Sequence, residues 1–448
     1  MKNPLAHRSL ISLAWPLIIT IGVGIALPVM DSLFLSIVSD AAAAGVGALG
    51  PVLFVLFTAI QSFSLAGANI AAQFQGAGLM SKARVSWNLQ IILALGIGIA
   101  AMLIVWLLSG FLGKAMGLKG EALAASILYL KVISPGMILK VFQTSLTNLA
   151  NSQGLTKLNL ASNILAVISN GFFNWIFISG AFGMPKLGVM GVAMGTTLSW
   201  IVMVLYLWFS LRNKMHLKPR KVHFRRGVGV VLPAWLRIGI PAAVEPVSFQ
   251  LNQVAVTALV VRLGMLATTS RVYAANLALL PVIFSLGLGT ATQTLIANQV
   301  GSQNFSKANS TLKKGLLGAT SFALGIGFLV ALTGPKLLGV FTDNPEVIIL
   351  GSAALWVDMV LQPAKAANIV LTNALRSTGD SKFPAIVGSL MMWTIGISAV
   401  VGFGYGLKFG LVGLWAGMAF DEWTRFIVNL WRWKSGAWQN KGVIKPKT

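Results

Sequence analysis

The sequence contains no cysteine, and its three histidines, His7, His216 and His223, lie in polar segments. Without cysteine the chain has no disulfide framework, no thiolate nucleophile and no cysteine-ligated metal site. It also lacks the glycine-rich phosphate-binding loop of ATPases and the HExxH motif of zinc proteases. We therefore expect neither an enzyme nor a cofactor.

Charged residues are also scarce. They make up 10% of the chain, whereas an ordinary soluble domain has about a quarter. Hydrophobic residues make up 56%, and the mean hydropathy is +0.81. This balance excludes a water-soluble globular domain and predicts an all-α integral membrane protein.

Twelve apolar stretches are long enough to cross a bilayer, because about 20 helical residues span its hydrocarbon core. The first is too long for the apolar core of a signal peptide and is expected to be retained. The twelve stretches run approximately over residues 9–36, 46–75, 86–112, 122–149, 158–182, 188–210, 233–260, 270–300, 314–334, 346–374, 384–405 and 409–431.

The few charges are unevenly distributed, with 34 Lys and Arg against 10 Asp and Glu and a formal net charge of +24. Most of the basic residues fall in alternate loops, above all in the loop at 211–227. Cytoplasmic loops retain Lys and Arg, so both termini are expected in the cytoplasm, with the chain in the plasma (inner) membrane. The basic surface predicts contact with membrane lipid rather than nucleic acid, and we expect a monomer.

The two halves of the chain are similar at an offset of about 225 residues. Trp15-Pro16 matches Ile240-Pro241, and Gly76 matches Gly301. Each half holds six spans, so the repeats share one orientation and form two pseudo-symmetric bundles that enclose a central cleft, as in transporters. The predicted domains are an amino-terminal bundle at 1–210, a basic linker at 211–232, a carboxyl-terminal bundle at 233–432 and a basic tail at 433–448.

Several short motifs recur in a characteristic order along this twelve-span repeat. The motifs are Trp15-Pro16, Asp31-Ser32, Ile70-Ala-Ala-Gln73, Gly76-Ala-Gly78, Lys82-Ala83, Ile296-Ala297, Gln299, Gly301 and Ala374-Leu-Arg376-Ser-Thr-Gly379-Asp380. In that order they resemble the multidrug and toxic compound extrusion (MATE) family of secondary transporters over nearly the whole chain.

The resemblance implies export of a small organic solute, driven by inward flow of H⁺ or Na⁺. Asp31 matches the family's acid in the first span, and a buried intramembrane acid is a site candidate in its own right. Asn170 matches a family Asn, whereas Asn174 stands where the family has an acid. Asp31, Asn170 and Asn174 are thus a candidate coupling-ion site, for a proton on Asp31 or for Na⁺, with the proton favoured. The alternative role for the two Asn is hydrogen bonding between helices.

Two lysines within the spans, Lys140 and Lys365, occupy the same repeat position. Lys365 stands where the family's sodium-coupled branch has an acid, which puts a carboxyl-terminal cation site in doubt. The two lysines either form salt bridges with Asp31, Glu245 or Asp358, or present positive charge to an anionic substrate, or extend to the membrane surface. We assign Glu245, Asp358 and both lysines to a candidate substrate cleft.

The leading hypothesis is therefore a proton-coupled exporter of amphipathic, drug-like solutes. The alternatives are an exporter of organic anions, a flippase of a lipid-linked precursor that uses a basic cleft, and a membrane scaffold that transports nothing. Asp421 and Arg425 are spaced i, i+4 and predict an ordinary ion pair on a helix surface.

Overall fold

The computed structural model describes residues 8–116, 118–215, 217, 225, 228–229 and 231–443, without the side chains of 25, 26, 29, 40, 44, 51 and 213. Most of the predicted linker, with His216 and His223, lies outside the described residues, as do His7 and the end of the predicted tail at 444–448.

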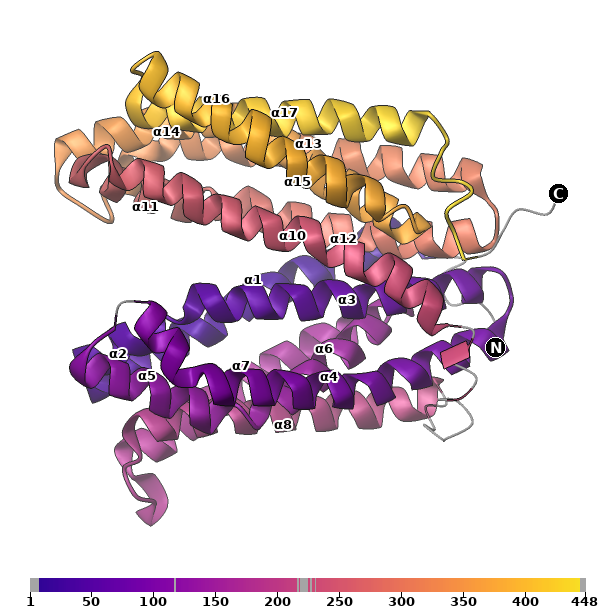
Figure 1. Ribbon diagram of the computed structural model, residues 1–448, viewed down its shortest axis with the longest axis horizontal. Helices are drawn as coiled ribbons and strands as arrows, with labels where there is room; N and C mark the ends of the chain where they lie inside the picture. Colours follow the sequence, from indigo (N-terminus) through magenta and orange to yellow (C-terminus); the bar gives the residue numbers. More distant parts are fainter. Residues whose placement is uncertain are drawn as a thin grey trace. The chain divides into compact units, whose positions relative to one another are not determined.

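The described residues are helical almost throughout (Figure 1). The amino-terminal half contains α1 (Leu10–Val38), α2 (Asp40–Gly47), α3 (Gly50–Gly76), α4 (Met80–Ala115), α5 (Gly120–Ile133), α6 (Gly136–Ser152), α7 (Thr156–Ser179), the turn η1 (Ala181–Gly183) and α8 (Gly188–Met215). The other half contains α10 (Leu232–Val261), α11 (Met265–Leu277), α12 (Leu279–Gly301), α13 (Phe305–Leu338), α14 (Pro345–Thr378), η2 (Pro384–Gly388), α15 (Ser389–Met391), η3 (Met392–Gly396), α16 (Ile397–Val401), η4 (Gly402–Gly406) and α17 (Gly410–Lys434).

All twelve predicted spans coincide with helical segments, but several boundaries differ. The span predicted at 270–300 is two helices, α11 and α12, and the one predicted at 46–75 is α3 preceded by the last two residues of α2. By length and composition, nine helices of the described part are apolar enough to cross a membrane, or ten if the bent pair α5–α6 is one span. A shorter apolar helical stretch, Leu10–Gly24, lies in α1, and α17 carries five charged residues, Asp421, Glu422, Arg425, Arg432 and Lys434.

Helix α4 shows how these helices suit a lipid environment. Its buried face carries small residues, such as Gly98 and Ala101, whereas Leu107 and Phe111 are 66% and 67% exposed. A soluble protein buries its large apolar side chains, but in lipid these can face outward while small residues let helices approach closely. The pattern is that of a membrane-spanning helix.

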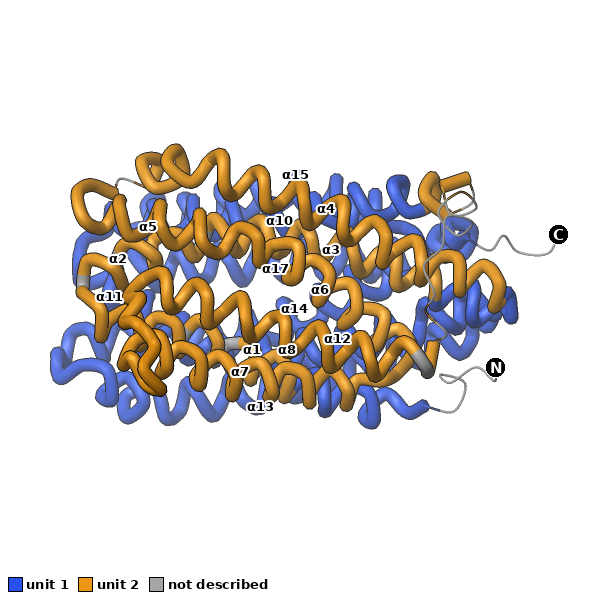
Figure 2. The backbone as a smooth tube through the Cα atoms, turned by 90° about the horizontal axis from the view of Figure 1, so that it is seen from below, with its two compact units in different colours: residues 1–18, 72–79, 235–448 blue, residues 19–71, 80–234 orange. Residues whose placement is uncertain are grey.

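The chain forms two compact units (Figure 2). Unit 1 comprises residues 1–18, 72–79 and 235–448, and unit 2 comprises residues 19–71 and 80–234. In unit 2, α7 packs on α8, α4 packs on α6, and α5 packs on α2 and α8. In unit 1, α14 packs on α11, α12, α13 and α17. The domain boundaries given by the sequence remain a prediction.

Two irregularities break the helical pattern. Helices α5 and α6 meet at Pro135 with a bend of 59°, because proline cannot donate the hydrogen bond that would continue the helix. The span at 384–406 contains three π-helical turns, η2, η3 and η4.

Each π turn adds about one residue to a helix that otherwise repeats every 3.6 residues. Glycines spaced eight apart, Gly388, Gly396 and Gly404, therefore stay on one face of this span instead of drifting around it. Gly388 approaches Glu245, and Gly396 approaches Asp421.

Candidate functional site

Asp31 lies in the second half of α1, in unit 2, and is 9% exposed. Its carboxylate is held by side chains of α7 and α8, and among the described residues its hydrogen-bond partners are all neutral. No Lys, Arg or His of the described part forms an ion pair with it. A buried carboxylate without a cation is costly in a membrane, by at least about 2.5–3.5 kcal/mol on insertion scales.

The two predicted asparagines of α7 both reach Asp31. Asn170 donates to Asp31 Oδ1 at 3.0 Å and Asn174 donates to the same oxygen at 2.9 Å. They lie one helical turn apart, and Asn174 also donates to Asn170 Oδ1 at 3.3 Å. Both are fully buried. The three residues that the sequence grouped as one site are therefore in direct contact.

A fourth residue, Thr196 of α8, was missed by the sequence analysis. Its hydroxyl donates to Asp31 Oδ2 at 2.7 Å and receives a bond from Asn170 at 3.3 Å. The phenol of Tyr129 in α5 also interacts with Asp31 and Thr196. The available signal was the glycine-rich start of α8, because Thr196 directly follows Gly195.

Glycines set the spacing of the helices around Asp31. A side chain at Gly195 would collide with the Asn174 amide oxygen, and one at Gly171 would meet the sulfur of Met30 at 2.8 Å. The absence of these side chains lets α7 approach both α1 and α8. The Asn174 amide oxygen is buried and accepts no hydrogen bond within the described residues.

The cluster of Asp31, Asn170, Asn174 and Thr196 can hold a proton on Asp31. Amide and hydroxyl donors stabilise its charged form, whereas protonation removes the charge and changes which of those hydrogen bonds can be made. A metal ion is less well served, because Na⁺ needs several oxygen ligands and the nearest groups present N–H and O–H donors to the carboxylate.

Lys140 of α6 is partly buried in unit 2 and interacts with aromatic rings. Its Nζ lies 5.5 Å from the ring centroid of Phe57 and 5.6 Å from that of Trp200, and donates to Gln143 at 3.2 Å. Contacts of this kind stabilise an ammonium without neutralising it. Lys140 forms no ion pair with the described carboxylates.

Lys365 of α14 has a similar environment in unit 1, where its Nζ lies 5.7 Å from the Phe249 ring. It acts electrostatically on Asp358, but that carboxylate is hydrogen-bonded by Trp415 at 3.0 Å and by Gln362 at 2.9 Å. Of the salt bridges predicted for the lysines, none is present among the described residues.

Glu245 of α10 is paired with an arginine instead. Arg376 Nη2 lies 2.5 Å from Glu245 Oε2, and both side chains are largely buried. The sequence did not predict this partner, because Arg376 lies at the end of a different span, far along the chain.

The predicted surface pair of Asp421 and Arg425 is wrong in one respect. The residues are paired at 2.8 Å but are 6% and 5% exposed. Spacing of i, i+4 places two residues on one face without saying which face. Here that face continues the buried stripe of α17 that begins at Leu411 and Leu414.

Comparison with known proteins agrees with the helical repeat. The MatE family model matches the chain twice, at residues 16–176 and 241–402. These two matches correspond to the two halves predicted from the sequence.

An uncharacterized transporter of Bacillus subtilis, YisQ, is 30% identical over 443 residues, covering 97% of this chain and 96% of the relative. The probable multidrug resistance protein NorM of Thermotoga maritima is 25% identical, covering 98% and 95%.

Solved structures share the fold over nearly the full chain. A MOP superfamily transporter from Pyrococcus furiosus, whose binding pocket is described as reversed in polarity, superposes with a TM-score of 0.85 at 20% identity and covers 98% of this chain and 99% of its own. The two family-model matches take up most of the chain, and the protein belongs to the MatE family of multi-pass membrane transporters, which are not enzymes.

Proposed function

We propose that this protein is a proton-coupled antiporter that exports amphipathic, drug-like organic solutes. The observation that carries the proposal is the environment of Asp31, a buried intramembrane carboxylate bonded by three neutral donors. A group of this kind gains or loses a charge when it exchanges a proton. The names of relatives such as the Thermotoga NorM support multidrug compounds as the exported class.

The donor set favours H⁺ over Na⁺ as the coupling ion. Two amide groups and one hydroxyl point their hydrogens at the carboxylate, and a bound cation would have to displace them. Asn174 also stands where the family has an acid, so the site has one carboxylate rather than two. One carboxylate can hold one proton, but it supplies few of the oxygen ligands that a metal cation needs.

The remaining features of the proposal concern the whole chain. We place it in the plasma (inner) membrane as a monomer, with both termini in the cytoplasm and a cleft between the bundles at 1–210 and 233–432. The concentration of Lys and Arg in alternate loops supports this orientation. The linker at 211–232 and the tail at 433–448 complete the proposed domains.

Reconstitution into proteoliposomes tests the coupling. Export of a fluorescent cationic dye is followed under an imposed pH gradient and, separately, under a sodium gradient. We expect the pH gradient to drive export and Asp31→Asn to reduce it at least tenfold, with Asp31→Glu partly active because it keeps the carboxyl group.

Asp343→Asn is the matched control, since Asp343 is an exposed carboxylate. It should transport like the parent protein. Export driven by sodium and indifferent to pH would overturn the choice of ion, and full coupling in Asp31→Asn would remove Asp31 from the mechanism.

A second candidate is export of organic anions, or flipping of an anionic lipid-linked precursor. It is favoured by Lys140 and Lys365, which lie on aromatic rings and form no ion pair with the described carboxylates. In this candidate the two ammonium groups would pair with the negative charge of the solute.

A pair of dyes with one aromatic skeleton but opposite charges separates the two candidates. If the solute is an anion, the double variant Lys140→Gln, Lys365→Gln should lose anionic-dye transport and keep transport of the cationic dye. If the solute is a cation, the parent protein should export the cationic dye and not the anionic one, and the double variant should leave export of the cationic dye equal to or above that of the parent.

A further inference from the structure

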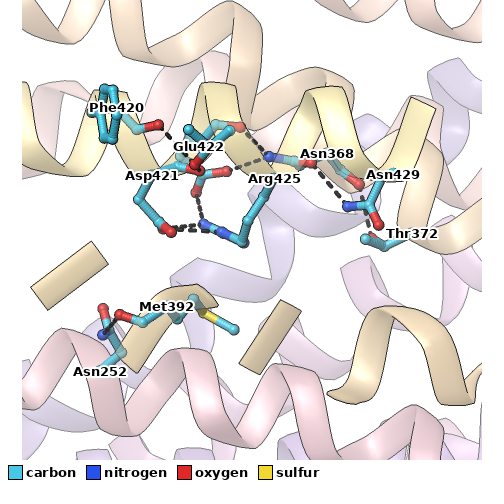
Figure 3. Close-up of polar contacts among 10 residues, drawn as sticks. Asn252, Asn368, Thr372, Met392, Phe420, Asp421, Glu422, Arg425 and Asn429 are labelled. Atoms are coloured by element: carbon cyan, nitrogen blue, oxygen red, sulfur yellow. Dashed lines mark hydrogen bonds and ion pairs between the residues drawn. The ribbon is translucent and has the colours of Figure 1, made fainter. Parts of the chain in front are cut away.

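Unit 1 contains a second buried carboxylate cluster, formed by Asp421, Glu422 and Arg425 of α17 (Figure 3). The Arg425 guanidinium lies 2.8 Å from Asp421 Oδ2 and 2.9 Å from Glu422 Oε1. Asn368 of α14 donates to Glu422 Oε2 at 2.8 Å and receives a bond from Asn429 at 3.2 Å. We call Asp421, Glu422 and Arg425 the α17 triad.

The α17 triad does not balance its own charge. With both carboxylates ionised, two negative groups share one guanidinium, which leaves a net charge of −1. All three residues are only 5–6% exposed, and a buried unpaired charge is strongly unfavourable. One additional positive charge is therefore needed at this position.

Among the described residues, the other charged groups near α17 do not supply that charge. Arg376 forms a salt bridge with Glu245, and Glu245 also interacts electrostatically with Arg425. Lys365 acts on Asp358. The span at 384–406, which packs on α17, has no ionisable side chain except Tyr405.

From α11, Arg271 lies over the ring of Trp415, 5.7 Å from its centroid. The charged groups that act on Asp421 are Arg425 and Glu422, its own neighbours on α17.

One atom of the α17 triad is free to take a proton. Asp421 Oδ2 is bonded to Arg425, but Asp421 Oδ1 is buried and has no hydrogen-bond partner among the described residues. It faces Gly396 in the π turn η3, where an added Cβ would lie 3.2 Å from this oxygen. The missing side chain leaves room for a hydrogen on Oδ1.

We propose that Asp421 is a second proton-binding site, separate from Asp31, and that its proton makes the α17 triad neutral. A proton fits better than a metal ion, because Arg425 would repel a cation and the open oxygen has no companion ligands. Binding adds one hydrogen to Asp421 Oδ1, and release returns the triad to −1. The chain then carries one exchangeable proton in each of its two halves, on Asp31 in the first and on Asp421 in the second.

Infrared difference spectroscopy tests this site without transport. The purified full chain in lipid nanodiscs is titrated with acid, and the C=O stretch of protonated carboxyl groups is recorded. We expect one band that disappears in Asp421→Asn and a different band that disappears in Asp31→Asn. Loss of one band leaves the other assignment standing, so failure at Asp421 and failure at Asp31 are distinguishable.

An unchanged spectrum in Asp421→Asn overturns the proposal. If that variant does not fold, Gly396→Ala replaces it, because the added methyl group presses on Asp421 Oδ1 while all charges remain. Gly402→Ala in the same span is the matched control, since its Cβ would meet nothing within 4 Å. The Asp421 band should shift in Gly396→Ala and not in Gly402→Ala; equal spectra would also overturn the assignment.

Discussion

The hydroxyl of Thr196 makes the shortest hydrogen bond to Asp31, at 2.7 Å. A hydrogen bond to a charged group contributes about 1.5–3 kcal/mol, and about 1.4 kcal/mol is a factor of ten. We therefore expect Thr196→Ala to reduce dye export driven by a pH gradient by about 10- to 100-fold, measured in proteoliposomes.

Two further variants isolate the hydroxyl. Thr196→Ser keeps the donor and should restore most of the export. Thr197→Ala removes a neighbouring hydroxyl that, among the described residues, bonds within its own helix to the Ala193 carbonyl at 2.9 Å, and should have little effect. Normal coupling in Thr196→Ala would mean that this donor does not stabilise the charged state of Asp31.

Gly195 is a second test of the Asp31 environment. An alanine there would place its Cβ against the Asn174 amide oxygen and backbone nitrogen. Because neither the backbone nor the buried amide can easily move, we expect Gly195→Ala to displace Asn174 and to abolish most pH-driven export.

Gly96→Ala is the matched change, since a Cβ at Gly96 in α4 would meet nothing within 4 Å. It should transport normally and gain about 0.5–1 kcal/mol in helix stability, seen as a small rise in melting temperature. Equal activity of the two glycine variants would contradict the close packing of α7 on α8.

At this scale the sequence revealed charged and amide residues better than hydroxyl groups. Asp31, Asn170 and Asn174 stood out because such side chains are rare within apolar spans and two of them lie one turn apart. Thr196 did not, since threonine is common in membrane helices. The sequence also did not predict which charged residues form pairs. The salt bridge of Glu245 with Arg376 joins α10 to α14, and hydrophobic periodicity carries no information about contacts between helices.

At the scale of the elements, buried tryptophans hold the segment after α17, residues 435–443, against the rest of unit 1. Trp438 is 1% exposed, stacks on Trp433 at 4.2 Å between centroids and meets the edge of Phe305 at 5.6 Å. Removing a buried tryptophan costs about 3–5 kcal/mol. We expect Trp438→Ala to detach this segment, measured as faster amide hydrogen exchange over residues 435–443.

Trp431→Ala provides the comparison. Trp431 lies in the last turn of α17, just before the segment, but its side chain is 63% exposed. Exchange over the segment should be unchanged in this variant. Protection of Val443, whose N–H donates to Gln73 Oε1 at 2.8 Å, reports directly on docking; its persistence in Trp438→Ala would show that the tryptophan does not hold the segment.

The positions of the elements were largely predictable, whereas their interruptions were only partly so. Apolar stretches of about 20 residues identify membrane-spanning helices in a sequence, and all twelve predicted stretches coincide with helical segments. The bend at Pro135 follows from proline chemistry. The π turns at 384–406 and the break between Leu277 and Leu279 depend on packing against neighbouring helices, which hydropathy does not record.

At the scale of the whole molecule, the charges divide into two populations. Most Lys and Arg residues lie outside the twelve predicted spans, and their distribution predicts the orientation of the chain. The carboxylates in the interior of the spans are buried, as at Asp31 in unit 2 and in the α17 triad in unit 1. The net charge of +24 therefore comes mostly from basic residues outside the spans. The proposed proton binding depends instead on a few buried carboxylates, which contribute little to that number.

The orientation of the two repeats can be measured directly, because the chain has no cysteine and each introduced cysteine is unique. Lys82 and Lys307 are exposed near the starts of α4 and α13, and Lys336 is exposed near the end of α13. Six spans per half place Lys82 and Lys307 on one side of the membrane. Helix α13 has 34 residues, long enough at 1.5 Å per residue to cross a bilayer, so Lys336 should lie on the other side.

A membrane-impermeant maleimide applied to intact cells should therefore label Lys336→Cys and leave Lys82→Cys and Lys307→Cys unlabelled until the cells are opened. Lys114→Cys, near the end of α4, is the matched position for Lys336→Cys in the first half and should label with it. If Lys82→Cys and Lys307→Cys label from opposite sides, the two halves are inverted and the shared orientation is wrong. If both label from outside, the repeats are parallel but the positive-inside assignment is reversed.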